Sequence, residues 1–395
     1  MVGPGLLAGL SDDDPAGITT YSVLGAEQGY RLLWVLLVST IALVLFHDLG
    51  SRMGVVTGQG LTGLVRETYG VRRAAVAVTA LVVANVGTTC AEFAGIAAGF
   101  ELFGVSRLLS VPAAALAVSL LVLRGNFHRV ERVLLLLSAV FVTYILAGLL
   151  AGPDWGAALR GTVTPSLPGS RDAIALATAT IGTTLAPWGL SFIQSYAADK
   201  HMTTDQLRYE RVDVITGAAL TGIIGFFVVV ACAATLYPQG VSINDATDAA
   251  RALEPLAGDL AAKLFGVGLI GAALLAASVL PLSTAYSVSE FVGREAALDD
   301  RPREAPLFYG TYAVIVTLSA AFILVPGIPL VSILVLTQIL NAVLLLPLLA
   351  FMYGIARDPA VMGEHAAGRG VSAAYLVAIA FIALCVGALA VLTVA

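Results

Sequence analysis

Long apolar segments, separated by short charged or Gly- and Pro-rich breaks, fill most of this chain. Eleven of them have the length that a helix needs to cross a bilayer. Their approximate limits are 5–28, 31–50, 74–103, 108–124, 132–152, 173–198, 212–237, 259–292, 306–326, 329–354 and 372–395. No long hydrophilic region separates them. We therefore expect an all-α polytopic membrane protein in which residues 1–395 form a single integral domain.

The composition agrees with this pattern. Charged residues make up 12% of the chain and hydrophobic residues 58%, whereas a soluble domain carries about 25% charged residues. No basic stripe of the kind that binds nucleic acid is present. Cys90, Cys232 and Cys385 lie inside apolar runs without metal-binding spacing, which is typical of small buried side chains.

The first apolar segment contains residues that a membrane helix normally excludes. It includes the run Ser11-Asp12-Asp13-Asp14-Pro15-Ala16-Gly17. A charge at membrane depth costs about 2.5–3.5 kcal/mol, so such charges are usually retained for a function. Proline removes a helical donor and glycine loosens the backbone. We interpret this run as the break of a discontinuous helix that carries a cation site.

The same interruption recurs in the sixth segment, 172 residues later. The stretches that match are Asp14-Pro15-Ala16-Gly17-Ile18-Thr19 and Ala186-Pro187-Trp188-Gly189-Leu190-Ser191. Corresponding interruptions in two inverted halves indicate the midplane site of a transporter. Two unrelated proline kinks are the alternative. We expect repeat one at about 1–152, repeat two at about 173–354 and a further span at 372–395.

The distribution of Lys and Arg predicts the orientation. With the N-terminus in the cytoplasm, 15 of the 21 basic residues fall on the cytoplasmic side. We therefore predict a plasma-membrane protein with a cytoplasmic N-terminus and, after eleven spans, an external C-terminus. The Ala-rich composition is typical of a bacterium with a GC-rich genome.

Several short motifs resemble the Nramp family of divalent-metal transporters. They are Gly3-Pro4-Gly5, Asp14-Pro15, Leu32-Leu33-Trp34-Val35, Arg52-Met53-Gly54-Val55-Val56-Thr57-Gly58 and Ala186-Pro187-Trp188. The resemblance is clear over residues 3–70, continues through the sixth span and is thin afterwards. It implies a LeuT-like fold, in which two inverted five-helix units and one further helix give eleven spans, with helices 1 and 6 broken.

The departures from the family pattern concern metal selectivity. The family reads Asp-Pro-Gly-Asn in the first span, but the asparagine position here is Gly17. Its Met-Pro-His motif is Ala186-Pro187-Trp188 in this chain, which removes a soft thioether ligand and a histidine associated with proton movement. Its Asp-x-x-Glu pattern has become Thr89-x-x-Glu92. The chain thus resembles the branch of Nramp-related magnesium transporters.

The resemblance implies a set of metal-site residues. The primary candidates are Asp14, Gly17, Glu92 and Ala186, with Ser11 and Thr183 at positions whose backbone carbonyls bind metal in the family. The secondary candidates are Trp188, Gln338, Asn341 and Thr89. Alternatives stay open for each kind. Asp14 suits a helix cap, Glu92 a structural acid, and the amides and hydroxyls helix–helix hydrogen bonds. We expect all four histidines near span ends or in loops.

The resulting hypothesis is a secondary transporter or facilitator of Mg²⁺, and also of Mn²⁺, that works by alternating access without proton coupling. The alternatives are a proton-coupled Mn²⁺/Fe²⁺ carrier and a Na⁺-coupled organic-solute carrier on the same fold. An enzyme is not expected, because the chain contains no His-Glu-x-x-His, Gly-x-Ser-x-Gly or phosphate-binding loop. The expected partners are the metal substrate and the lipid bilayer, with no cofactor, nucleic acid or obligate protein partner.

Overall fold

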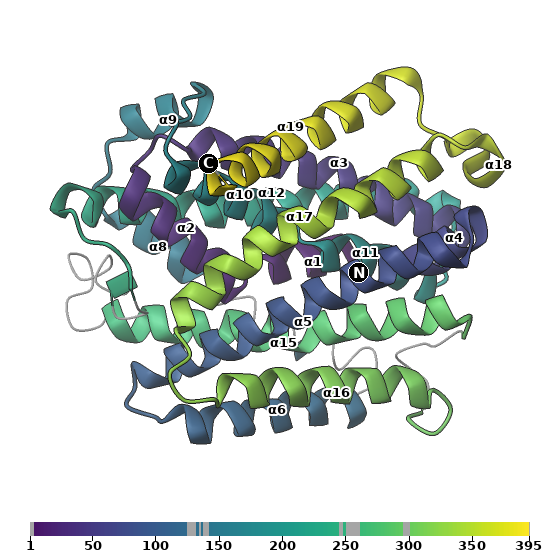
Figure 1. Cartoon of the computed structure of the whole chain (residues 1–395), viewed down its shortest axis with the longest axis horizontal. Coiled ribbons are helices and arrows are strands. Elements are labelled where there is room, and N and C mark those ends of the chain that lie inside the picture. The colour runs from purple at the N-terminus through teal and green to yellow at the C-terminus, as the bar shows by residue number, and fades with distance from the viewer. Residues whose placement is uncertain are drawn as a thin grey trace.

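A computed structural model describes residues 4–394, except for 125–131, 134–135, 137–141, 245–247, 250–260 and 295–300. The described residues form helices and no strand (Figure 1). Most long helices run roughly along one common direction, which is the arrangement that a bundle of membrane-crossing helices requires. The predicted all-α class is therefore confirmed.

The helices follow the predicted apolar segments closely. The long ones are α3 (Leu33–Thr57), α5 (Val71–Glu101), α6 (Arg107–Arg124), α12 (Leu207–Thr235), α15 (Ala261–Val292), α16 (Pro306–Ile323), α17 (Leu330–Ala356) and α19 (Arg369–Val394). Two broken pairs are α1 (Pro4–Asp12) with α2 (Pro15–Gln28) and α10 (Arg171–Thr184) with α11 (Pro187–Asp199). Shorter helices are α4 (Leu61–Tyr69), α8 (Val142–Leu150), α9 (Trp155–Val163) and α18 (Pro359–Met362).

Eight helical segments of the described chain are long and apolar enough to cross a membrane, with α10 and α11 counted together. The other predicted spans have simple explanations. Segment 5–28 is divided between α1 and α2, and the apolar part of α6 is shorter than a full span. Segment 132–152 lies partly outside the described residues. The count of eleven thus stays a prediction.

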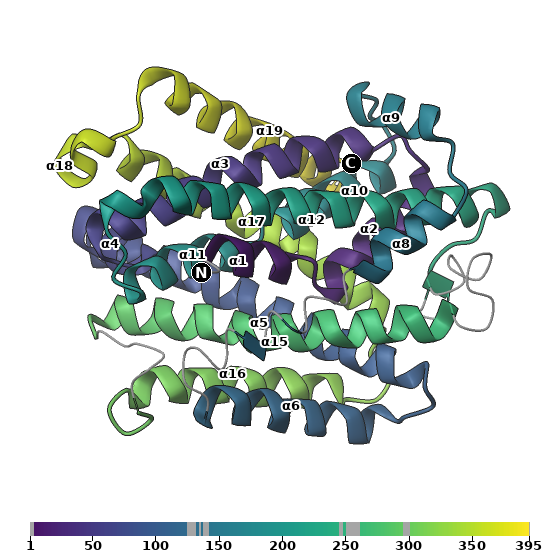
Figure 2. The same ribbon diagram turned by 180° about the vertical axis from the view of Figure 1, so that it is seen from behind.

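The outer helices expose apolar side chains. Both views place α6 and α16 side by side at one edge of the molecule and α19 at the opposite edge (Figures 1 and 2). Exposed residues on these helices include Leu108, Leu116, Leu318, Val377 and Leu384. In water such a surface is unfavourable, but it matches the hydrocarbon core of a bilayer.

Helix α3 is longer than the predicted span 31–50, because it continues to Thr57. Polar residues on the last turns of α3 form hydrogen bonds or ion pairs with residues of other helices. Asp48 pairs with Arg211 of α12 at 2.9 Å, and Arg52 donates to the Tyr375 hydroxyl of α19 at 2.9 Å. Arg52, which the hydropathy pattern places beyond the end of the span, is thus satisfied within the longer helix.

The first halves of both broken helices pack closely against neighbouring helices through glycine. Gly9 of α1 meets Gly217 of α12, and a side chain at Gly182 of α10 would overlap the Gln338 carbonyl of α17. Such close approach between helix backbones requires a residue without a Cβ atom. The two breaks that follow these helices are consequently held in the interior of the bundle.

Candidate metal centre

Both helix breaks lie at the positions that the repeated motif predicts. Helix α1 ends at Asp12 and α2 begins at Pro15, while α10 ends at Thr184 and α11 begins at Pro187. Each proline occupies the first helical position, where its missing N–H has no helical partner to lose. The residue before each proline is extended, so the chain leaves one helix and enters the next through two non-helical residues.

Asp14 is the N-cap of α2. Its Oδ1 accepts a hydrogen bond from the Gly17 backbone N–H at 2.5 Å. The positive end of the helix dipole favours a carboxylate at this place. The Asp14 carboxyl group also interacts with that of Glu92 on α5, and both side chains are buried. Capping the helix therefore leaves Asp14 facing a second acid inside the protein.

Oxygen atoms from both broken helices converge on Gly17. A Cβ atom at this glycine would lie 3.0 Å from Thr183 Oγ1, 3.1 Å from the Asp12 carbonyl oxygen and 3.2 Å from Asp14 Oδ1. The Thr183 hydroxyl comes from α10, whereas the other two oxygens come from the break between α1 and α2. A carboxylate, a carbonyl and a hydroxyl oxygen together have the ligand chemistry of a hard-cation site.

Many polar atoms in this region have no hydrogen-bond partner in the protein. They include both carboxylate oxygens of Asp12, Asp13 and Glu92, the Thr183 hydroxyl and the Trp188 indole nitrogen. Buried polar groups are normally paired, because leaving one unpaired costs about 1–3 kcal/mol. In the described part of the chain, no three His, Cys, Asp or Glu side chains form a metal cluster. Hydroxyl, carbonyl and water oxygens are therefore needed to complete the coordination of an ion here.

The three consecutive aspartates face different neighbours. Asp14 faces Glu92, as described above. Asp13 interacts with Tyr21, whose hydroxyl lies 2.9 Å from Thr184 Oγ1. Asp12 faces His47 of α3, with 4.0 Å between its Oδ2 and His47 Nε2. The three carboxyl groups thus have different nearest partners, although they also interact with one another.

Comparison with known proteins identifies the family. The sequence matches the family described as natural resistance-associated macrophage protein-like (Nramp) over residues 5–392. The chain belongs to the Nramp family. A relative from Acidiphilium cryptum, named divalent metal cation transporter MntH, is 29% identical over 391 residues, which cover 94% of this chain and 86% of the relative.

Solved structures share this arrangement of helices. The manganese transporter of Eremococcus coleocola, in complex with an aromatic bis-isothiourea compound, superimposes with a TM-score of 0.78 at 16% identity, covering 97% of this chain and 84% of that one. MhsT, solved with L-phenylalanine, superimposes with a TM-score of 0.68 at 14% identity, covering 100% and 98% of the two chains. These similarities confirm the predicted LeuT-like fold.

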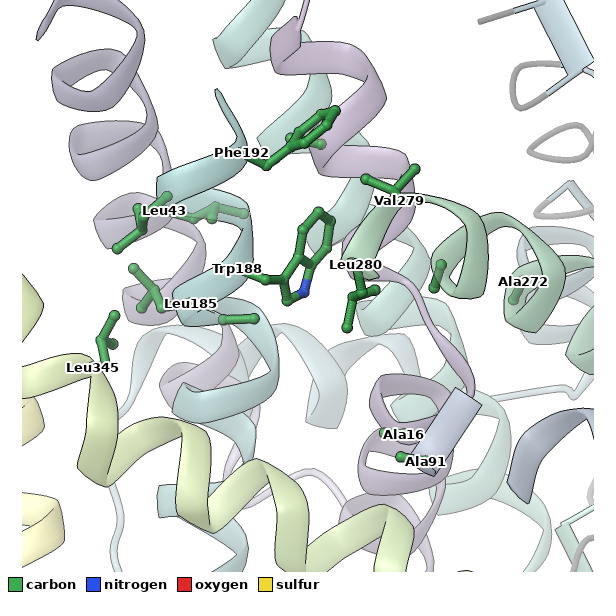
Figure 3. Close-up of a cluster of buried hydrophobic side chains, with 14 of the residues drawn as sticks. Ala16, Leu43, Ala91, Leu185, Trp188, Phe192, Ala272, Val279, Leu280 and Leu345 are labelled. Carbon is green, nitrogen blue, oxygen red and sulfur yellow. The ribbon is translucent and has the colours of Figure 1, made fainter. Parts of the chain in front are cut away.

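Two of the positions at which this Nramp chain departs from the family pattern, Ala186 and Trp188, lie at the second break. Ala186 precedes α11 and has no side chain with which to cap it. Trp188 is fully buried and lies beside Phe192, Val279 and Leu280 (Figure 3). Its backbone carbonyl accepts a hydrogen bond from the Ser283 hydroxyl at 2.9 Å. The tryptophan therefore packs between α11 and α15 in an apolar setting.

The polar secondary candidates Gln338, Asn341 and Thr89 form hydrogen bonds within and between helices. The Asn341 amide donates to Thr88 Oγ1 and to Gln338 Oε1, both at 3.0 Å. Thr89 donates to the Asn85 carbonyl of its own helix at 2.6 Å. This network joins α5 to α17, in agreement with the alternative that amides and hydroxyls at membrane depth form helix–helix hydrogen bonds.

A row of polar contacts continues from the second break along α11 and α15. Ser191 and Ser287 hydroxyls lie 2.8 Å apart, Ser195 donates to Glu290 at 2.5 Å, and Tyr286 donates to Asp199 at 2.8 Å. We call the contacts from Ser283–Trp188 to Tyr286–Asp199 the α11–α15 ladder. Its far end lines a cavity of about 520 Å³, together with the turn before α4. The ladder thus connects the break with a polar cavity.

The expectation for the histidines is wrong for His47. This residue lies well inside α3, is completely buried, and neither ring nitrogen has a hydrogen-bond partner. The predicted span ended near it, which made it look peripheral. Periodicity contained the missing signal, because Ser39, Leu43, His47 and Ser51 follow one another at intervals of four residues and all are buried.

The structure also adds detail to the predicted backbone ligands. The carbonyl beside Gly17 belongs to Asp12, one residue after Ser11, and Thr183 presents its side-chain hydroxyl there. Ser11 itself is buried in the last turn of α1. An alignment of motifs cannot distinguish these atoms, because the choice depends on how far α1 is wound before it breaks.

Proposed function

We propose that this chain moves Mg²⁺, and also Mn²⁺, across the membrane by alternating access without coupling to protons. The observation that carries the proposal is the convergence of oxygen atoms from both broken helices on Gly17. Mg²⁺ takes oxygen ligands in octahedral geometry and usually keeps several waters. Oxygen atoms that converge beside a residue without a side chain supply the donor chemistry that such an ion needs.

The neutral second break supports the choice of Mg²⁺ over a transition metal. Ala186 contributes no sulfur where the family pattern has methionine. Soft thioether ligands select against Mg²⁺ and Ca²⁺, so their loss removes a preference for Mn²⁺ or Fe²⁺. This argument assigns the chain to the magnesium-transporter branch of the Nramp family. The relatives named divalent metal cation transporter agree with transport of a divalent cation in general.

Proton coupling is argued against by two positions, Thr89 and Trp188, where the family pattern has an acid and a histidine. The buried pair Asp12–His47 is the feature that favours proton coupling, because both of its side chains are titratable. An organic-solute carrier is disfavoured, because Asp14 and Glu92 place two acids in the centre of the bundle. Two buried carboxylates attract a cation and repel a carboxylate such as that of an amino acid.

The wider arrangement belongs to the same proposal. Residues 1–395 form one transport domain in the plasma membrane of a bacterium, with two inverted repeats and a further span at 372–395. The N-terminus is cytoplasmic and the C-terminus external. The ion is surrounded by Asp14, Gly17, Glu92, Ser11, Thr183 and Ala186. The α11–α15 ladder lines the path of the ion between this site and the polar cavity.

Uptake into liposomes tests this function. Purified protein is reconstituted, and entry of Mg²⁺, Mn²⁺ and Ca²⁺ is recorded together with an internal pH probe. Asp14→Asn keeps a capping acceptor but removes the charge, so we expect Mg²⁺ uptake to fall by about 100-fold, or to background for Asp14→Ala. Asp172→Asn, which alters an exposed acid in the first turn of α10, is the matched control and should transport normally.

Three results would contradict the proposal. Mg²⁺ uptake that persists in Asp14→Asn removes the assigned site, and a pH change that requires the metal gradient removes the uncoupled mechanism. Uptake of Mn²⁺ without Mg²⁺ would favour the proton-coupled Mn²⁺/Fe²⁺ carrier in its place.

A further inference from the structure

Asp12 and His47 form a buried pair that the proposed Mg²⁺ site does not use. Both are at most 1% exposed, and 4.0 Å separates Asp12 Oδ2 from His47 Nε2. Neither carboxylate oxygen and neither ring nitrogen has a hydrogen-bond partner. This separation is too long for a direct hydrogen bond, and it allows one bridging partner to contact both groups.

Gly189 of α11 borders this pair. A Cβ atom at residue 189 would lie 3.2 Å from His47 Nε2 and 3.4 and 3.7 Å from the two Asp12 carboxylate oxygens. The glycine therefore leaves a small space lined by an imidazole nitrogen and a carboxylate. Close packing brings the imidazole there, because Gly54 of α3 lies against the Gln194 carbonyl of α11.

The internal repeat relates the space at Gly189 to the position of Gly17. Gly17 and Gly189 hold the same place in the two Pro-x-Gly motifs, 172 residues apart. The first glycine faces three oxygens, and the second faces one nitrogen and two oxygens. Asp12 contributes to both, since its backbone carbonyl lies beside Gly17 and its carboxylate beside Gly189. The two halves of the molecule thus carry two related spaces with different donor atoms.

We propose that Asp12, His47 and the space at Gly189 form a second cation subsite, selective for divalent first-row transition-metal ions over Mg²⁺. A donor set of imidazole and carboxylate prefers such ions, whereas an oxygen-only set suits Mg²⁺ and Ca²⁺. Metal bonds of about 2.1 Å to nitrogen and oxygen span up to about 4.2 Å, so both atoms reach one ion with a small side-chain rotation. Water completes its coordination.

The effect of this subsite on transport rests on the proposed function. Because the subsite adjoins the Asp14 site, a transition-metal ion bound between Asp12 and His47 would inhibit Mg²⁺ passage without displacing Mg²⁺ from Asp14. The proposal of the subsite itself depends on different side chains. Binding measurements can therefore separate the failure of one from the failure of the other.

The experiment counts Co²⁺ ions bound to the full-length protein in detergent by equilibrium dialysis, and repeats the measurement with excess Mg²⁺. We expect two Co²⁺ per chain, of which Mg²⁺ displaces one. His47→Gln should lower Co²⁺ affinity at the retained site at least about tenfold and leave Mg²⁺ binding unchanged. Asp14→Asn should remove the ion that Mg²⁺ displaces and keep the other.

Two further variants test whether a loss of Co²⁺ binding is specific to the subsite. His365→Gln removes a histidine that lies 3.8 Å from Glu364 at the surface, and it should not alter the count. Gly189→Ala fills the space without removing a ligand and should reproduce the loss seen in His47→Gln, so it serves where that variant does not fold. A wild-type protein with one Co²⁺ per chain, or His47→Gln and Gly189→Ala proteins that retain two with unchanged affinity, would overturn the subsite.

Discussion

The two helix breaks share their backbone but differ in their chemistry. Asp14 and Ala186, the residues before the two prolines, have φ and ψ of −74° and 170°, and −67° and 136°, respectively. Only the first has a side chain that caps the helix it precedes. The Pro-x-Gly motif is therefore sufficient to interrupt a helix, and the carboxylate at one break is an addition with a separate purpose.

The second halves of the broken helices are consequently held in different ways. Helix α2 is stabilised at its N-terminus by its own aspartate. Helix α11 lacks such a cap and is tied along its length to α15 through the α11–α15 ladder, from Ser283 to Asp199. One repeat thus supplies the charge that attracts a cation, and the other supplies neutral groups and a polar border toward the cavity.

Among the variants that test this difference between the two breaks, we expect the largest effect from a substitution of Glu290, which breaks the α11–α15 ladder. Its carboxylate accepts hydrogen bonds from the hydroxyls of Ser195 and Thr62, at 2.5 and 2.9 Å, and from backbone N–H groups of Thr62 and Gly63 at the start of α4. Glu290→Ala leaves the Ser195 hydroxyl and the two backbone N–H groups without this acceptor, whereas the Thr62 hydroxyl keeps the Ser287 carbonyl at 2.7 Å. We expect the free energy of unfolding to fall by about 3 kcal/mol, seen as a lower thermal midpoint in detergent.

Ser195→Ala is a milder variant of the same contact. It removes one donor and leaves Glu290 bonded to α4, so a loss of about 1 kcal/mol is expected. Equal midpoints for Glu290→Ala and wild type would mean that the ladder does not hold α11, and the contrast between the two second halves would disappear.

Selectivity should shift when the lost family ligands are restored. Gly17→Asn together with Ala186→Met adds an amide oxygen and a thioether to the two breaks. Because sulfur favours transition metals, we expect the ratio of Mn²⁺ to Mg²⁺ uptake to rise about tenfold, or about 1.4 kcal/mol. Competition between the two ions in liposomes measures it directly.

Space at Gly17 limits the outcome of this double variant. Its new Cβ atom would lie 3.0–3.2 Å from three oxygens, so those groups have to move by a few tenths of an ångström. Ala186→Met alone avoids that strain and separates the sulfur from the crowding. Unchanged discrimination in both variants would contradict the soft-ligand argument.

Local patterns predicted the breaks well and their surroundings less well. Pro15 and Pro187 determine where α2 and α11 begin, because proline acts through its own backbone. His47 was missed because its role depends on the packing of α3 against α11, which is a contact between distant residues. The extension of α3 to Thr57 has the same origin, since Tyr375, the partner of Arg52, is remote in sequence.

The smallest effect is expected at Trp188, the largest side chain of the second break. Trp188→Phe keeps an aromatic ring beside Phe192, at present 6.2 Å away between ring centroids, and removes an indole N–H that has no partner. Loss of packing volume and loss of an unpaired buried donor oppose each other, so stability should change by less than about 1 kcal/mol. Mg²⁺ uptake should stay within about twofold, since an apolar wall at this place needs shape and not a donor. A tenfold loss of uptake at unchanged stability would show instead that the indole N–H acts on the ion or its water, and would make the second break a polar contributor equal to the first.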